Sequence, residues 1–389
     1  NLDQATEIFC VFKTSLDAAY KIPINPMNIK TSVTNTDLNE LVKQILTKLS
    51  KSTSHDFDFL VAGEILRGDL RSHLLKHNIE NEKNIEVEYV LALSEPKQDK
   101  STDVQNWLNK FFVLDSGVMA CFYNGDVKIF DEQMVPGVEL NLYPTADEFQ
   151  KNVRSFCMLD GNGYKTIVSC NFFGELFASN IYDDNRPVKT NKLTDLDTVM
   201  ECFYANPLSE SLFCSGNTNG DLFIWNLKTA SAKSEIVRSK EKLHGNSITN
   251  VMWINESEIL STGMDDQLII SDVNTLKPTY NIYIKDNTIT SVDYSSAAQS
   301  MLTGHTNGII RVFDDRKRDK TSTAQFKSHN TTVSTIKYCP SNDNLFVSGC
   351  YDGKIKLWDF RMTLPMYTID SHSGEKIFDI AWLCEIISG

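Results

Sequence analysis

The sequence predicts a mainly β protein in which a large β-propeller, residues 105–389, follows a small α+β domain, residues 1–93. Three observations lead to this fold class. A turn-and-strand pattern recurs every 42 to 49 residues through most of the chain, and the residues before it lack that pattern. The length of 389 residues, with 41% hydrophobic content, is enough to bury two separate cores.

The sequence of the N-terminal domain predicts the element order ββαββ. Alternating apolar residues indicate strands at 6–14 and 19–24. Thr36 is a suitable N-cap for the amphipathic helix that follows. The apolar residues of this helix share one face: Leu38, Leu41, Val42, Ile45, Leu46 and Leu49. A strand, a turn at Gly63 and a second short strand come next, and NIEVEYVLAL predicts the last strand.

The repeated pattern is clearest in YDGKIKLWDF, residues 351–360. Its glycine suits a tight turn between two strands, where a positive φ is often required. Polar and apolar residues then alternate, which is the period of a strand. A repeat of this length accommodates four short strands, the size of one propeller blade. The six turn positions are Gly125, Gly174, Gly220, Asp266, Gly308 and Gly353.

These repeats resemble the WD-repeat family. The resemblance implies a buried hydrogen-bonded chain within a blade, formed by a histidine, a serine or threonine, the turn aspartate and a tryptophan. Blade six matches it with His329, Ser348, Asp352 and Trp358. Such a chain is structural, because it satisfies polar groups that are costly to bury. Blade four keeps its first three members but has Ser271 in place of the tryptophan; those members are His244, Ser261 and Asp265.

The last blade is expected to be incomplete. One further period would place a seventh turn beyond residue 389. Closing the ring would therefore need an outer strand from elsewhere, and residues 90–104 are the expected source. Within them, the polar run 94–104 is also expected to link the two domains.

The stretch FLVAGEILRGDLRSHLL makes the first domain similar to ubiquitin, a β-grasp fold. No Gly-Gly tail follows its last strand, so a docking role is expected in place of conjugation. Together, the two domains resemble the WD-repeat assembly factors of the PeBoW complex. The similar Notchless family is an alternative, but its propeller has an eighth blade, and residues 105–389 have room for seven.

The PeBoW resemblance implies a non-enzymatic adaptor of pre-ribosomal particles in the nucleolus and nucleoplasm, acting in large-subunit assembly and pre-rRNA maturation. Its propeller would bind the block-of-proliferation protein, in a complex with pescadillo. Its ubiquitin-like domain would dock on the AAA+ ATPase midasin. Family members present a glutamate there to the Mg²⁺ of the midasin adhesion site. In the loop NIENEKNIEVEY, aligning VEY places this glutamate at Glu82, with Glu80 as the alternative.

Other function classes have less support. The formal charge of −13 opposes binding to DNA or an anionic membrane. The sequence lacks the common catalytic motifs and has no Cys/His cluster with metal-ligand spacing, so no enzyme activity and no cofactor of its own are expected. The nine cysteines, without a CxxC pair, are expected to be buried reduced thiols.

Four further stretches of the sequence have more than one interpretation. The basic run Arg316, Lys317 and Arg318 is a candidate RNA contact, although neighbouring aspartates favour a solvated loop. Residues 358–361 match a WDxR motif, so the chain also resembles substrate receptors of cullin ubiquitin ligases. His305, in LTGHTNG, is expected on the surface of a turn. A core or strand position is favoured over an exposed patch for Phe111, Phe112, Phe172 and Phe173.

Overall fold

The structure is a computed structural model of the chain. The structure describes the whole chain except residues 1–6, 52–53, 77–83, 94, 98, 116, 144–151, 162–163, 183–188, 229–232, 286, 319–320, 328, 371, 373, 384–385 and 389. The chain divides into two compact units, Asn1–Lys97 with Phe360–Thr363, and Gln98–Asp359 with Leu364–Gly389. Most of the described secondary structure is β, as predicted. Neither described helix has the length and apolar character needed to cross a membrane.

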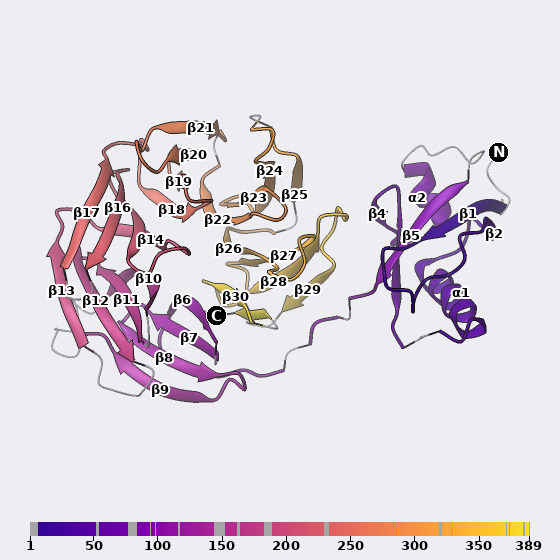
Figure 1. Ribbon diagram of the computed structural model, residues 1–389, viewed down its shortest axis with the longest axis horizontal. Coiled ribbons are helices and arrows are strands. Elements are labelled where there is room, and N and C mark those ends of the chain that lie inside the picture. Colours follow the sequence, from indigo (N-terminus) through magenta and orange to yellow (C-terminus); the bar gives the residue numbers. More distant parts are fainter. Residues whose placement is uncertain are drawn as a thin grey trace. The chain divides into compact units, whose positions relative to one another are not determined.

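The first unit contains one five-stranded sheet with the order β2-β1-β5-β3-β4 and two helices (Figure 1). The central strands β1 and β5 are parallel, whereas β2 pairs antiparallel with β1. This is the α+β arrangement that the sequence predicts. Its elements are β1 (Glu7–Lys13), β2 (Met27–Lys30), α1 (Asn35–Lys48), β3 (Phe57–Val61), β4 (Glu64–Ile65), α2 (Leu70–Lys76) and β5 (Ile85–Leu91).

Helix α1 begins two residues earlier than predicted. Its N-cap is Thr34 and not Thr36, because the Thr34 hydroxyl accepts the Asp37 backbone N–H while the Asp37 carboxylate accepts the Thr34 N–H. The predicted apolar face is confirmed, since Val42 and Leu46 are fully buried in the core of this unit. That face therefore fixes the helix against the sheet.

The second strand lies later than predicted. Strand β2 pairs Met27 with Cys10 and ends at Lys30, whereas residues 19–24 are turns and irregular chain. Pro23 and Pro26 explain the shift, because proline has no N–H to donate to a strand ladder. The alternation at 19–24 is therefore not a strand signal.

The second unit contains seven sheets that follow one another along the chain and are arranged in a ring (Figure 1). Each of the first six consists of four antiparallel strands, as a propeller blade requires. Blades one to three contain β6 (Leu108–Leu114), β7 (Gly117–Phe122), β8 (Asp126–Asp131), β9 (Pro136–Asn141), β10 (Val153–Gly161), β11 (Tyr164–Asn171), β12 (Glu175–Tyr182), β13 (Lys189–Asp195), β14 (Met200–Ala205), β15 (Leu212–Asn217), β16 (Leu222–Lys228) and β17 (Lys233–Lys240).

The remaining blades include the seventh sheet, of which two strands are described. Blades four to seven contain β18 (Ile248–Trp253), β19 (Glu258–Gly263), β20 (Gln267–Asp272), β21 (Pro278–Tyr283), β22 (Ile289–Ser295), β23 (Ser300–His305), β24 (Ile309–Asp314), β25 (Ala324–Lys327), β26 (Val333–Tyr338), β27 (Leu345–Cys350), β28 (Lys354–Asp359), β29 (Tyr367–Asp370), β30 (Ile380–Trp382) and β31 (Ile386–Ser388).

All six predicted turn positions have positive φ, from 60° at Asp266 to 84° at Gly220. At Gly220 a side chain would also lack space, because an added Cβ would lie 2.2 Å from the backbone oxygen of His244. The repeat therefore marks turn positions at which the backbone adopts a left-handed conformation, with positive φ.

The ring closes through its inner strands. Strand β30 packs between β26 of blade six and β6 of blade one. The expectation that residues 90–104 supply an outer strand is wrong for the described residues. Leu91 ends β5 in the sheet of the first unit, and the described residues from 92 to 104 form no strand. Their charged, proline-containing sequence lacks the apolar alternation that a blade strand needs.

Candidate functional site: the buried polar chains of the propeller

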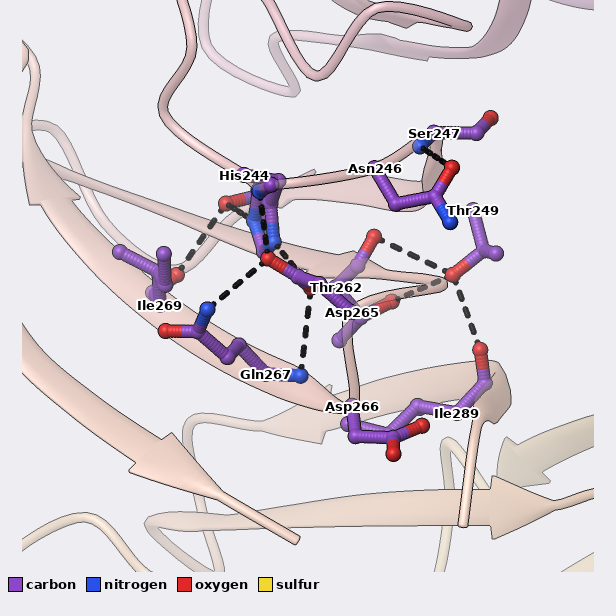
Figure 2. Close-up of polar contacts among 12 residues, drawn as sticks. His244, Asn246, Ser247, Thr249, Thr262, Asp265, Asp266, Gln267, Ile269 and Ile289 are labelled. Atoms are coloured by element: carbon purple, nitrogen blue, oxygen red, sulfur yellow. Dashed lines mark hydrogen bonds and ion pairs between the residues drawn. The ribbon is translucent and has the colours of Figure 1, made fainter. Parts of the chain in front are cut away.

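Blade four contains a buried histidine with both ring nitrogens engaged (Figure 2). His244 Nδ1 lies 2.9 Å from Asp265 Oδ1, and Nε2 lies 2.9 Å from Ser261 Oγ. The Gly245 N–H also donates to Asp265, at 2.8 Å. Burial opposes ionisation of Asp265, but the His244 ring and these donors hold the pKa of its carboxyl below the usual value. The predicted residues of blade four thus meet in one hydrogen-bonded chain.

The chain in blade four ends without a tryptophan. Ser271 occupies that position, fully buried, and its hydroxyl has no hydrogen-bond partner in the part of the chain that the structure describes. In blade three, by contrast, Trp225 Nε1 donates to Ser215 Oγ at 2.8 Å. Blade four therefore relies on apolar packing where blades three and six use an indole.

Blade six joins three of its four predicted residues. His329 Nε2 lies 2.7 Å from Ser348 Oγ, and Trp358 Nε1 donates to the same oxygen at 2.9 Å. Asp352 instead accepts the Lys354 N–H, at 3.1 Å. His329 Nδ1 has no hydrogen-bond partner among the described residues. Asp352 of blade six therefore does not bind the histidine of its blade, whereas the corresponding Asp265 of blade four does.

Burial and the nearby charge of Lys356 lower the pKa of His329 to about 4. The ring is therefore neutral at physiological pH, with one nitrogen carrying a proton and the other a lone pair. A neutral imidazole can form structural hydrogen bonds or coordinate a metal ion, and it carries no charge that would attract an anion.

The expectation of a surface position for His305 is wrong. The side chain is fully buried at the end of β23, where Nε2 lies 2.9 Å from Thr303 Oγ1 and Nδ1 lies 3.1 Å from the backbone oxygen of Asn287. The reason is that His305 precedes the turn and pairs with Ile289 on the inner strand. Strand register, and not the turn sequence, decides its burial.

The basic run is partly neutralised by carboxylates. Arg318 Nη2 lies 2.7 Å from Glu258 Oε2, and Arg316 Nη2 lies 2.9 Å from Asp314 Oδ2. Lys317 is exposed. Two of the three cations therefore already have partners, which weakens the case for phosphate binding, and RNA contact stays a prediction.

Other predicted residues divide between the core, the surface and the part that is not described. Trp358 and Asp359 of the WDxR motif are buried. Phe172 and Phe173 are exposed by 47% and 62%, against the favoured expectation, because they occupy the turn between β11 and β12. The partly buried Phe111 and Phe112 pack against core clusters, as expected. Glu82 and Glu80 lie outside the described residues.

One residue that sequence reasoning missed closes the ring. Asp379, directly before β30, accepts the Phe111 N–H of blade one at 2.9 Å. Its other oxygen accepts the Thr335 hydroxyl of blade six at 3.1 Å. The only sequence signal is an acidic residue before an apolar strand, and that pattern is too common to identify a partner far along the chain.

Comparison with known proteins agrees with this architecture. Residues 8–74 match the NLE (NUC135) domain, and residues 320–359 match the WD domain, G-beta repeat. The chain is also similar, over 92 to 98% of its length, to proteins named Ribosome biogenesis protein WDR12 homolog.

Three such relatives illustrate the similarity. The Arabidopsis thaliana protein is 24% identical over 98% of this chain and 93% of its own length. For the Dictyostelium discoideum protein these values are 25%, 92% and 86%, and for the Drosophila persimilis protein they are 27%, 93% and 88%.

The fold and its buried polar chains define a WD-repeat propeller protein with an N-terminal α+β domain. The NLE domain and the relatives, which extend over nearly the whole chain, support a factor of the WDR12 type, within the PeBoW class.

Proposed function

We propose that this protein is a non-enzymatic adaptor in ribosome biogenesis, acting in assembly of the large subunit. The observation that carries the proposal is the extent of the similarity. Relatives named as ribosome biogenesis proteins match 98% of the chain, so the likeness includes both the NLE domain and the propeller. A propeller alone would be weaker support, because one fold serves many functions.

The propeller is the proposed binding surface for the block-of-proliferation protein, in a complex with pescadillo on the pre-ribosomal particle. This role places the protein in the nucleolus and nucleoplasm. Exposed aromatic side chains such as Phe173 are consistent with a protein-binding surface, since aromatic residues are enriched in interface cores. A scaffold of buried hydrogen-bonded chains also suits a rigid binding platform better than a catalytic centre.

The N-terminal domain is proposed to dock on the adhesion-site domain of midasin. Glu82 supplies the carboxylate that completes the coordination of Mg²⁺ held by midasin, and Glu80 is the alternative ligand. A hard divalent cation prefers oxygen ligands, so a single exposed carboxylate is sufficient chemistry for such a contact. Phe12, Phe59 and Tyr89 are buried in the core of this unit, so the proposed docking domain has a packed core of its own.

The test is a pull-down of the full chain with the midasin adhesion-site domain, in magnesium and in EDTA. Wild type is compared with Glu82→Ala and with Glu80→Ala, a matched control in the same loop. We expect binding that needs magnesium and Glu82 but not Glu80. Loss only in Glu80→Ala would reassign the ligand, whereas no binding of wild type in magnesium would reject midasin docking.

A further inference from the structure

Blade six has an unusual residue at a position that is defined by strand register. Cys350 is the last residue of β27 and pairs with Val333 on the inner strand. In blade one the corresponding residue is Phe122. The corresponding pairs in the next four blades place asparagine in blades two and three, glycine in blade four and histidine in blade five. These residues are Asn171, Asn217, Gly263 and His305. A thiol thus stands where three other blades have a hydrogen-bonding side chain and where blade four has a glycine, next to which His244 and Asp265 leave no room for a Cβ.

The thiol belongs to a compact group of metal-binding side chains. One ligand atom each from His329, Cys350 and Asp352 lies within 4.8 Å of the other two. His329 is 5% exposed, Cys350 is fully buried and Asp352 is half-buried. Among the residues that the structure describes, this is the group of at least three His, Cys, Asp or Glu side chains with such spacing.

The unpartnered nitrogen of His329 is the second, independent observation. Its Nδ1 is buried without a hydrogen-bond partner in the described part of the chain, which is a costly state for a polar atom. Its Nε2 is held by Ser348. Metal-binding histidines commonly fix one ring nitrogen in this way, so that the other presents its lone pair to the ion.

Blade four shows what happens without the thiol. There Gly263 replaces the cysteine, and Asp265 binds the Nδ1 of His244 directly at 2.9 Å. Blade six has a histidine and an aspartate at the same two positions, His329 and Asp352. Here Cys350 takes the place of the glycine, and the described residues contain no hydrogen bond between His329 Nδ1 and Asp352. The cysteine therefore coincides with the break in the hydrogen-bonded chain.

We propose that His329, Cys350 and Asp352 form a binding site for a thiophilic divalent cation, with Zn²⁺ as the best match. Nitrogen, sulfur and carboxylate oxygen are the ligands that zinc takes in proteins. Zinc bond lengths of about 2.0–2.3 Å place tetrahedral ligands up to roughly 3.8 Å apart, so ligand atoms that lie within 4.8 Å of one another need to approach by at most about 1 Å. Three protein ligands leave a fourth position for water or a partner's side chain.

The test uses Co²⁺ as a spectroscopic probe of the full chain, after treatment with a chelator. A cobalt–thiolate bond gives a sulfur-to-metal charge-transfer absorption, which reports directly on the cysteine. We expect one equivalent of Co²⁺ to produce this band and Zn²⁺ to remove it by displacement. Cys350→Ser is expected to abolish the band, and Asp352→Asn is expected to weaken Co²⁺ binding by about tenfold or more.

Cys214→Ser is the matched control, because Cys214 is also a fully buried propeller cysteine but belongs to no such group among the described residues. This variant should keep the band. Thermal unfolding gives a second readout: Zn²⁺ should raise the melting temperature of wild type and of Cys214→Ser, but not of Cys350→Ser. Absence of the band in wild type, or its persistence in Cys350→Ser, would overturn the proposal and leave Cys350 as a packing residue.

Discussion

The buried imidazole of His305 predicts a specific loss of stability in acid. Burial, and secondly the charge of Arg311, lower the pKa of His305 from 6.5 to about 4. Between these two pH values the unfolded chain binds a proton at this position and the folded chain does not. The free energy of unfolding must therefore fall as the pH falls from 6.5 towards 4. A difference of this size corresponds to roughly 3 kcal/mol for the full window.

The perturbation that isolates this contribution is His305→Asn, because asparagine occupies the corresponding position in blades two and three. Asparagine does not titrate in this range. The variant is expected to be less stable at neutral pH, since two hydrogen bonds of the ring, to Thr303 and Asn287, are altered. The test is therefore the pH dependence of the free energy of unfolding, and not its value at neutral pH.

The assay is urea unfolding of both proteins above pH 6.5 and at several lower pH values down to about 4. Titration of all other groups, including His329, is common to both proteins and cancels in the comparison. Wild type should lose roughly 3 kcal/mol more than the variant over this window. Equal losses would refute the inference that His305 is buried and neutral in the folded protein.

Three further substitutions test other contacts by the same unfolding measurement. Trp358→Phe removes the donor to Ser348 and should lower stability by about 2 kcal/mol; an unchanged stability would mean that the indole N–H has no structural role. Asp379→Ala leaves the part-buried Phe111 N–H without its acceptor and should cost about 1–2 kcal/mol, with faster hydrogen exchange at that amide as the specific sign. Ser271→Ala removes a buried hydroxyl without a partner among the described residues, so stability should stay equal or rise by up to about 1 kcal/mol, and a large loss would reveal an unrecognised hydrogen bond.

The propeller repeat could be predicted from the sequence because it depends on local backbone conformation. The turns at Gly220 and Gly353 need positive φ, and glycine signals that need locally, so the period and the fold class follow from the chain itself. The apolar face of α1 is equally local. The position of β2 was predicted wrongly because the alternation of apolar and polar residues before Pro26 was given more weight than the prolines, which have no N–H to donate to a strand ladder.

The candidate sites were less predictable, because they depend on strand register and on contacts between distant segments. His305 looked exposed in its local sequence, but its pairing with Ile289 buries it. The sequence matched blade six to a four-membered chain, but it could not show that Asp352 accepts a backbone N–H while His329 Nδ1 stays unbonded. Spacing alone does not give the direction of a side chain.

The contact between Asp379 and Phe111 has a consequence for synthesis of the protein. These residues are 268 positions apart, so the inner strand of blade one lacks this partner until nearly all blades have left the ribosome. Each blade can form its own antiparallel strand pairs as it emerges, but ring closure waits for the segment around Asp379. During translation the growing propeller therefore has one blade face without a neighbour at each end, and the face of blade one remains exposed for longest.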